Sequence, residues 1–412
     1  MSIRRGMHTP VVLLTGRGCT GRVAAALRET PGTAVISHTL DGHVVRRRVS
    51  MLRAGAPWDS DWILELGNAD PGRTIHDDLL ILLRRVHRRQ DVDRVVVLLD
   101  ERTELELICY AINHTPVCVG PGYADGPAAL DVHISSVVTC VDTDSWLAHA
   151  MGDDELDDHR SAAQAVVDQA EFADVLVLSK PERRTEAVLR RLAPRSRITC
   201  DITSIESILR NLHPLARRGA DFDPHESLLT GQPPLVSEAG VSLLDFTATR
   251  PFHPARLHTA IDVLLEGVVR TRGRVWLASQ PDTVVWIESA GMELRVGNVG
   301  RWLAAMDASE MAAADADRRI MAAARWDDQH GDRHVAMTIL TCGADPGEIL
   351  RILRWALLTD EEFSQPGRWA NYADPFGDWR AGPFESVSYG SAGEHPDIIR
   401  GHGADDRIGD TS

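Results

Sequence analysis

The first residues that could do chemistry form a glycine-rich loop near the N-terminus. A short apolar run, Pro10 to Leu14, leads into residues 16–23, which read GRGCTGRV, and a helical pattern follows. A loop of the form G-x-x-x-x-G-K-[ST] between a strand and a helix binds phosphate. Its glycines let backbone N–H groups surround the anion, its lysine reaches the terminal phosphates and its hydroxyl group holds magnesium. Both glycines of the pattern, Gly16 and Gly21, are present.

Two positions of this loop differ from the pattern that hydrolyses a nucleotide. Arg22 stands in place of the lysine, and Val23 stands in place of the serine or threonine. Arginine keeps the charge, but its planar fork does not replace a compact ammonium group, and valine offers no oxygen to magnesium. The loop therefore indicates either a vestigial anion site built on Gly16, Gly21 and Arg22, or an ordinary strand–turn–helix junction without a ligand.

The elements around the loop alternate in a way that is typical of a parallel sheet. Short, continuous apolar runs are separated by helical patterns throughout the first half of the chain. Strands give such continuous runs when helices cover both faces of their sheet. We expect strands at residues 10–14, 34–36, 94–99, 117–120, 136–141 and 175–178, and helices at residues 20–27, 77–89 and 161–173.

A different pattern begins after a linker. Residues 217–240 contain several prolines and glycines and few large apolar side chains, which predicts a break between two domains. Beyond it we expect strands at residues 241–248, 275–278, 284–288, 294–296 and 334–340, and helices at residues 254–268 and 346–358. Strands on both sides of two helices predict an α+β sandwich of the split-βαβ kind. Residues 381–412 are rich in Gly, Asp, Ser and Pro, which predicts a disordered tail.

The composition excludes several classes of protein. The 412 residues are enough for two domains, and a hydrophobic fraction of 43% is enough for real cores. The formal net charge of −16 argues against a protein dedicated to coating DNA or other nucleic acid. No apolar run reaches the roughly 18 residues that a membrane span needs. The six cysteines are scattered without a Cys-x-x-Cys pair, which fits reduced thiols in a cytoplasmic protein.

Six blocks of the second half resemble the C-terminal domain of the CobW metallochaperone family, in the family's order. They begin at residues 250, 269, 331, 342, 357 and 374 and read RPFHPARL, VRTRGRVWLA, GDRH, CGADP, LLTDEE and DPFGDW. The resemblance covers residues 241–379 and implies a CobW C-terminal domain over residues 241–380. It also implies that residues 1–216 form a P-loop NTPase-like α/β domain, a mostly parallel sheet with helices on both faces, which the linker 217–240 connects to that domain.

The family's nucleotide motifs are only partly kept. Its guanine-reading motif, N-K-x-D, corresponds to residues 179–182, which read SKPE, so the resemblance assigns Lys180 and Glu182 to a guanine edge. The family's glutamate–threonine switch motif should follow the strand at 94–99, but residues 98–101 read LLDE. Together with the altered glycine loop, these changes imply a degenerate GTPase homologue. We expect at most a vestigial GTP site and no efficient hydrolysis.

The family's metal motif, G-C-x-C-C, is also missing. It lies shortly before an acidic–leucine helix start, which is present here as HDDLL at residues 76–80, but residues 69–74 read ADPGRT. Asp70, His76 and Asp77 are alternative metal ligands, although acidic residues are favoured in a first helical turn without any metal. We therefore expect no zinc and no certain cofactor.

One branch of the family fits this loss of motifs, namely the mycobacterial-type factors that recruit the ribosome hibernation factor protein Y. Residues 40–48 (LDGHVVRRR), 84–89 (RRVHRR) and 120–131 (GPGYADGPAALD) resemble that branch. Its cysteine-free form goes with zinc starvation, and a protein that is needed when zinc is scarce should not depend on zinc. The resemblance implies a stress-response adaptor that recruits protein Y to the ribosome, at its small subunit.

Two basic runs suit contact with the phosphates of rRNA. The predicted contact residues are Arg46, Arg47 and Arg48 in the first run, and Arg84, Arg85, Arg88 and Arg89 in the second. The alternative is a solvated surface whose arginines pair with some of the 60 acidic residues of the chain. An acidic chain can also attract a small basic partner such as protein Y by electrostatic steering.

Two other functions remain open at this point. The family resemblance by itself favours a CobW-type GTP-dependent zinc metallochaperone. The retained loop glycines favour a regulator that binds GTP without cleaving it. GTP turnover separates the chaperone from the adaptor, because turnover needs a bound magnesium ion and an oriented water molecule.

Overall fold

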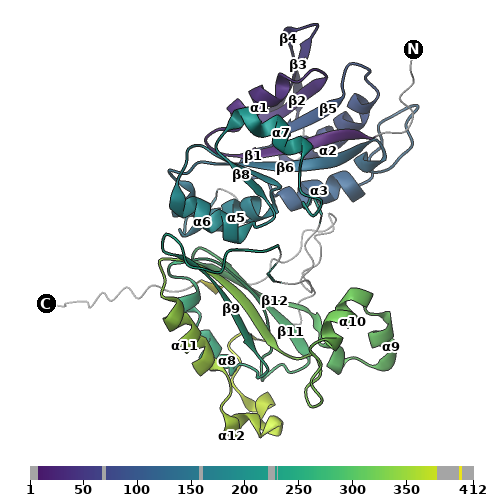
Figure 1. Ribbon diagram of the computed structural model, residues 1–412. Helices are drawn as coiled ribbons and strands as arrows, with labels where there is room; N and C mark the ends of the chain where they lie inside the picture. The colour runs from purple at the N-terminus through teal and green to yellow at the C-terminus, as the bar shows by residue number, and fades with distance from the viewer. Residues whose placement is uncertain are drawn as a thin grey trace, which may run out of the picture. The chain divides into compact units, whose positions relative to one another are not determined.

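The computed structural model describes residues 8–66, 71–156, 161–220, 228–229, 231–377 and 399–400. The chain forms two compact units (Figure 1). Unit 1 comprises residues 1–147, 165–222 and 230–233, and unit 2 comprises residues 148–164, 223–229 and 234–412. Segment 148–164 therefore belongs to the second unit. The predicted tail at 381–412 lies outside the described residues, except for Ile399–Arg400.

Unit 1 is built on an eight-stranded sheet in the order β4-β3-β2-β5-β1-β6-β7-β8. Its strands are β1 (Thr9–Gly16), β2 (Thr33–Asp41), β3 (Val44–Arg53), β4 (Ala56–Glu65), β5 (Arg94–Leu98), β6 (Val132–Val141), β7 (Val175–Leu178) and β8 (Arg197–Thr199). Neighbouring strands run parallel from β2 across to β8, and only β3 and β4 run antiparallel to their neighbours. The predicted mostly parallel sheet is confirmed.

Helices cover both faces of this sheet (Figure 1). They are α1 (Thr20–Arg28), α2 (Pro71–His87), α3 (Leu105–His114), α4 (Trp146–Ala150), α5 (Ala162–Phe172), α6 (Arg183–Leu192) and α7 (Ile205–Arg210). Strand β1 shows why both faces need cover. Val11 and Leu13 pack with α2 and α3 on one side, whereas Val12 and Leu14 pack with α1 and α7 on the other. Because successive strand residues point to opposite faces, a strand buried on both sides must be apolar throughout.

The hairpin of β3 and β4 was not expected from the sequence. Strand β3 pairs antiparallel with both β2 and β4, and its three arginines therefore alternate between the two faces. The turn at Ala54 and Gly55 takes positive φ angles of 49° and 80°. The strand predicted at 117–120 is wrong, because in the described structure this segment forms only an isolated bridge from Val117 to Gly126.

Unit 2 is built on an antiparallel sheet in the order β14-β12-β11-β10-β13-β9. Its strands are β9 (Val241–Ala248), β10 (Val268–Val275), β11 (Thr283–Ala290), β12 (Glu293–Arg301), β13 (Val335–Cys342) and β14 (Ile399–Arg400). Its helices are α8 (Pro254–Thr259), α9 (Ala308–Ala313), α10 (Ala316–Ala323), α11 (Pro346–Ala356) and α12 (Asp360–Phe363). Strands β9 and β10, which α8 connects, both pair antiparallel with β13 between them. This arrangement is the split-βαβ unit that the sequence predicts.

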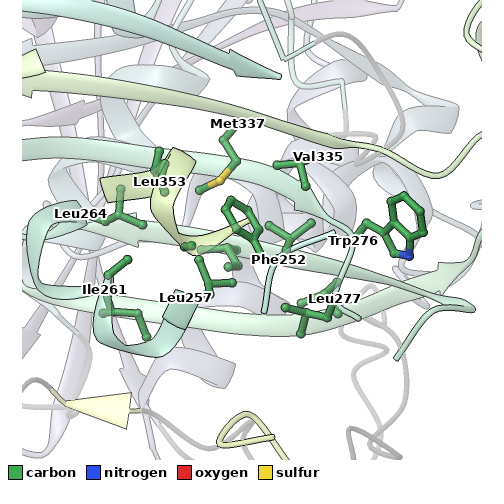
Figure 2. Packing of buried hydrophobic residues seen from close by; sticks show 14 of the residues in the cluster. Phe252, Leu257, Ile261, Leu264, Trp276, Leu277, Val335, Met337 and Leu353 are labelled. Carbon is green, nitrogen blue, oxygen red and sulfur yellow. The ribbon is translucent and has the colours of Figure 1, made fainter. Parts of the chain in front are cut away.

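The core of unit 2 lies between the sheet and helices α8 and α11. Figure 2 shows Phe252, Leu257 and Leu353 packed against Met337 of β13. Phe252 is fully buried, and its backbone N–H donates to the carbonyl oxygen of Trp276 at 2.9 Å. The RPFHP block therefore anchors the sheet to its helix layer. The helix predicted at 254–268 is shorter in the structure and ends at Thr259. The strand predicted at 275–278 is misplaced, because β10 begins at Val268 and ends at Val275.

Among the residues that the structure describes, no helix has the length and the apolar character that crossing a bilayer requires.

Candidate functional site

The glycine loop lies at the carboxyl end of β1, between the ends of β5, β6 and β7. Gly16 has a φ angle of +98°, and a Cβ atom there would lie 2.0 Å from the carbonyl oxygen of Cys140. Gly18 has a φ angle of +87°, and its Cβ atom would lie 3.0 Å from that of Asp142. Both positions therefore require glycine. Gly21 lies in the first turn of α1 with open space beside it, so packing does not demand glycine there.

The position that would hold magnesium faces the core instead. Val23 is fully buried among apolar residues that include Leu14 and Leu27. The nearest hydroxyl group in the loop belongs to Thr20, and it donates to the carbonyl oxygen of Gly16 at 2.8 Å. Arg22 is exposed. A P-loop needs a hydroxyl oxygen directed at the phosphates to bind magnesium, so this loop does not fit a magnesium–nucleotide complex.

An ion pair that sequence reasoning missed ties the loop to the end of β5. The guanidinium group of Arg17 donates from Nε and Nη2 to the two carboxylate oxygens of Glu101, at 2.6 Å each. The Thr15 hydroxyl also donates to the carbonyl oxygen of Asp100 at 3.0 Å. The sequence could have indicated this pair only if β1 and β5 had been known to be neighbours, because the ends of adjacent parallel strands meet at one edge of the sheet.

The residues assigned to a guanine edge have other partners in the structure. Lys180 forms an exposed ion pair with Asp144, and this hydrogen bond raises the pKa of Lys180. Glu182 caps α6, because its carboxylate accepts hydrogen bonds from the backbone N–H groups of Arg184 at 3.0 Å and Thr185 at 2.6 Å. The hydrogen bonds from Thr185 and Arg184 hold the pKa of Glu182 below its usual range. Both carboxylate oxygens of Glu182 are thus engaged in holding the start of α6.

The first basic run lies on β3, where each arginine has an acidic partner. Arg46 pairs with Asp41 and Arg48 with Asp59, each at 2.9 Å, and both arginine side chains remain about half exposed. Arg47 points to the other face and pairs with Asp78 at 2.6 Å. Arg46 and Arg48 are therefore the accessible members of this run.

The second basic run clamps the loop that precedes β6. Arg84 is only 3% exposed, and it donates to Asp131 at 2.7 Å and to the carbonyl oxygen of Ala124 at 2.7 Å. The guanidinium group of Arg88 lies 3.5 Å from the ring centroid of Tyr123. Their neighbours are held as well: Arg85 donates to the carbonyl oxygen of Val119, Arg88 to that of Gly122, and Arg89 pairs with Asp91. Arg84 is thus buried where no RNA phosphate can reach it, which corrects its assignment to a contact surface.

Two imidazole–carboxylate pairs lie near the start of α2. His38 Nε2 lies 2.8 Å from Asp78 Oδ2, and His76 Nδ1 lies 3.2 Å from Asp77 Oδ1. Helix α2 begins at Pro71, so Asp77 lies beyond the first turn in which the sequence placed it. Asp70 falls outside the described residues. Across the part of the chain that the structure describes, no three His, Cys, Asp or Glu side chains gather closely enough to hold a metal ion.

Comparison with known proteins establishes the family. The model of the cobalamin synthesis protein CobW C-terminal domain matches residues 241–357. The zinc chaperone Rv0106 of Mycobacterium tuberculosis is 52% identical over 377 residues, which are 92% of this chain and 95% of that protein. The chain belongs to the CobW family.

Two further matches to this CobW-family chain are weaker. The zinc-regulated GTPase metalloprotein activator 1 of Dictyostelium discoideum is 25% identical over 268 residues, 59% of this chain and 56% of that protein. The crystal structure of the Zn(II)-bound YjiA GTPase from E. coli matches 85% of this chain and 99% of that chain, at 14% identity and a TM-score of 0.35.

The expectation that zinc has no part in this CobW-family chain is wrong. It depended on the missing cysteine motif, but a relative that is 52% identical over almost its whole length is named a zinc chaperone. Imidazole nitrogen and carboxylate oxygen also bind zinc, so the loss of thiolates did not exclude the metal. The names of the relatives lend no support to a ribosome adaptor, and that interpretation stays a prediction.

Proposed function

We propose that this protein is a CobW-type zinc chaperone, which binds Zn²⁺ as cargo and delivers it to other proteins. The observation that carries the proposal is the 52% identity to a zinc chaperone over 95% of that protein's length. Identity of this extent spans both units, so the proposal covers the whole chain and not only the C-terminal domain. The matched CobW C-terminal domain supports the same assignment.

The donor chemistry of unit 1 is compatible with zinc. The pairs His38–Asp78 and His76–Asp77 combine the two non-thiolate ligand types that zinc accepts. A histidine that ligates zinc commonly donates its other ring nitrogen to a carboxylate, so these carboxylates are suited to orient the imidazoles. We propose that His38 and His76 contribute to the cargo site. Zinc binding then has to draw the ligands together, since the described residues hold no ready cluster of three.

Magnesium-dependent GTP hydrolysis is not part of this proposal. Val23 faces the apolar core where a hydroxyl group would be needed, and Glu182 is engaged as a helix cap. Cargo binding and release therefore depend on the zinc ligands and the client, and not on a nucleotide cycle.

Equilibrium zinc binding tests the proposal. The metal-free full-length chain is titrated with zinc in competition with a chromophoric chelator of known affinity. We expect stoichiometric binding, and we expect His38→Ala and His76→Ala each to lower the affinity at least about tenfold, as loss of a ligand or its support does. His133→Ala, at an exposed position on β6, is the matched control. Absence of zinc binding refutes the function, whereas normal binding by both variants refutes only the ligand assignment.

The ribosome adaptor that recruits protein Y is the second, untested proposal. If rRNA contact occurs, the exposed side chains of the two runs, Arg46, Arg48, Arg85, Arg88 and Arg89, can provide it, whereas the buried Arg84 cannot. Co-sedimentation with ribosomes, with and without protein Y and in the presence of a chelator, tests it. Binding that the double variant Arg46→Ala and Arg48→Ala abolishes supports the adaptor, and protein that stays in the supernatant throughout refutes it.

A further inference from the structure

Two cysteines meet beneath the glycine loop. Cys19 immediately precedes α1, and Cys140 lies near the end of β6. Each is only 2% exposed, and both belong to the core that packs α1 against the sheet. Cys140 is the register partner of Gly16 on β1 and of Val177 on β7. The pair therefore links the loop, the helix that follows it and the centre of the sheet.

The position of the Cys19 thiol places it beside Cys140. Its Sγ–H donates to the carbonyl oxygen of Val177 at 3.5 Å, directly next to Cys140 in the sheet. A hydrogen bond between the two thiols, together with the charge of Arg22, lowers the pKa of Cys19 against the effects of burial and Asp142. The same hydrogen bond and burial raise the pKa of Cys140. The two neighbouring thiols therefore differ in acidity, and Cys19 is the more acidic of the pair.

A reactive cysteine and its resolving partner need such a difference in thiol acidity. The thiolate is the nucleophile in thiol chemistry, and helix N-termini and nearby cations favour it. Cys19 has both, because α1 begins at Thr20 and Arg22 lies in its first turn. The other described cysteines occupy different places, with Cys118 and Cys200 exposed and Cys109 and Cys342 in other parts of the fold.

We propose that Cys19 and Cys140 are an oxidation site, at which peroxide converts the dithiol to a disulfide that locks the glycine loop. The Cys19 thiolate attacks one peroxide oxygen and gives a sulfenic acid, with release of the first water molecule. The Cys140 sulfur then attacks the sulfenic sulfur, the S–S bond forms, and the second water molecule leaves. In sum, two thiols and one hydrogen peroxide give one disulfide and two water molecules.

The consequence for the loop follows from its contacts. The backbone N–H of Arg17 already donates to the carbonyl oxygen of Cys140 at 3.0 Å, and Gly16 is pressed against the same oxygen. In the reduced state, the start of α1 is held to β6 by non-covalent contacts alone. A disulfide adds a covalent link between the same two elements and so holds the loop more firmly to the sheet.

Peptide mapping of the full-length protein tests the proposal. Protein treated with hydrogen peroxide is alkylated without reduction, digested and searched for a peptide pair joined through Cys19 and Cys140. We expect this cross-link to be the principal disulfide, to disappear with dithiothreitol, and to slow amide exchange at residues 19–23 at least tenfold. Cys109→Ser is the matched control, because it removes another buried thiol and should leave the cross-link intact.

The result that overturns the proposal is equally direct. If the exposed Cys118 and Cys200 are oxidised while Cys19 and Cys140 remain fully alkylatable after unfolding, the pair is not an oxidation site. This experiment uses the wild-type protein, so its result does not depend on whether a Cys140→Ser variant would fold. Cys19→Ser, immediately before α1, serves as the second variant. A disulfide between Cys140 and another cysteine in this variant would also contradict the assignment.

Discussion

At the scale of the residue, the glycine loop is shaped by side chains that serve the fold. Val23 fills the core between α1 and the sheet, Arg17 is held by two hydrogen bonds to Glu101, and Glu182 caps the next helix along the edge. None of these side chains offers magnesium the hydroxyl oxygen that a P-loop supplies. The loop therefore keeps Gly16 and Gly18, which its backbone requires, without a hydroxyl group at position 23 to bind magnesium.

The first prediction concerns Val23. Val23→Thr restores a hydroxyl group at the magnesium position, but it also buries that group among apolar side chains. We expect a loss of about 1–3 kcal/mol in the free energy of unfolding. Urea denaturation measures it, with Ala25→Ser at an exposed position of α1 as the control. A threonine variant that magnesium and GTP stabilise markedly would show that the loop is still a working site.

At the scale of the element, helix α2 and the loop before β6 form one structure. The arginines of α2 satisfy backbone carbonyl oxygens of a glycine- and proline-rich loop that has little regular hydrogen bonding of its own. Residues 84–89 and 120–131, which both resemble the same branch of the family in sequence, therefore contact each other in the structure.

The second prediction compares the losses of stability on removal of Arg84, in α2, and of Arg88, which directly follows α2. Arg84→Ala leaves the part-buried Asp131 and two carbonyl oxygens without their donor, so we expect a loss of about 3 kcal/mol or more. Arg88→Ala removes a more exposed contact with Tyr123 and should cost about 1 kcal/mol. Thermal or urea unfolding of the two variants measures both losses and shows which variant is less stable. Equal losses would mean that Arg84 does not hold the loop.

Strands with a continuous apolar run or a regular alternation could be predicted from the sequence, whether they are central like β5 and β7 or at a sheet edge like β9, but the hairpin of β3 and β4 could not. Strands β5, β7 and β9 were predicted almost to the residue because their apolar runs are continuous or regularly alternating. Strands β3 and β4 were missed because three consecutive arginines conceal the alternation of an edge hairpin. The place of the glycine loop was predictable from local pattern, but the Arg17–Glu101 and Cys19–Cys140 contacts arise from strand order, which no local pattern contains.

At the scale of the whole molecule, the stability of the second unit at low pH depends on one buried carboxylate. Glu288 of β11 is buried against Arg270 and Arg272 of β10, and it accepts hydrogen bonds from Trp286 Nε1 at 3.0 Å and Gln164 Nε2 at 3.2 Å. Burial alone would raise its pKa, but the two guanidinium groups outweigh burial and hold the pKa far below its usual range. Gln164 also joins segment 148–164 to this sheet.

The third prediction follows from the sign of that pKa shift. Because the pKa of Glu288 is lower in the folded state, its contribution is fully present above the unfolded value of about 4.3 and is lost progressively as the pH falls below it. Glu288→Gln should lower the free energy of unfolding at neutral pH by about 3–5 kcal/mol and flatten its dependence on pH below about 4. Asp360→Asn, in an exposed pair with Arg250, is the control and should change stability by less than about 1 kcal/mol. If the free energy of unfolding of Glu288→Gln falls as steeply at low pH as that of the wild type, the account is contradicted.

Delivery of zinc is the most direct test of the proposed function. The full-length protein is loaded with one equivalent of zinc and mixed with a metal-free zinc enzyme, in a chelator buffer that keeps free zinc too low to activate it. We predict that the enzyme regains activity at a rate that rises with the concentration of loaded protein. If the rate equals that of the buffered zinc alone at every protein concentration, this chain does not deliver zinc and is not a zinc chaperone.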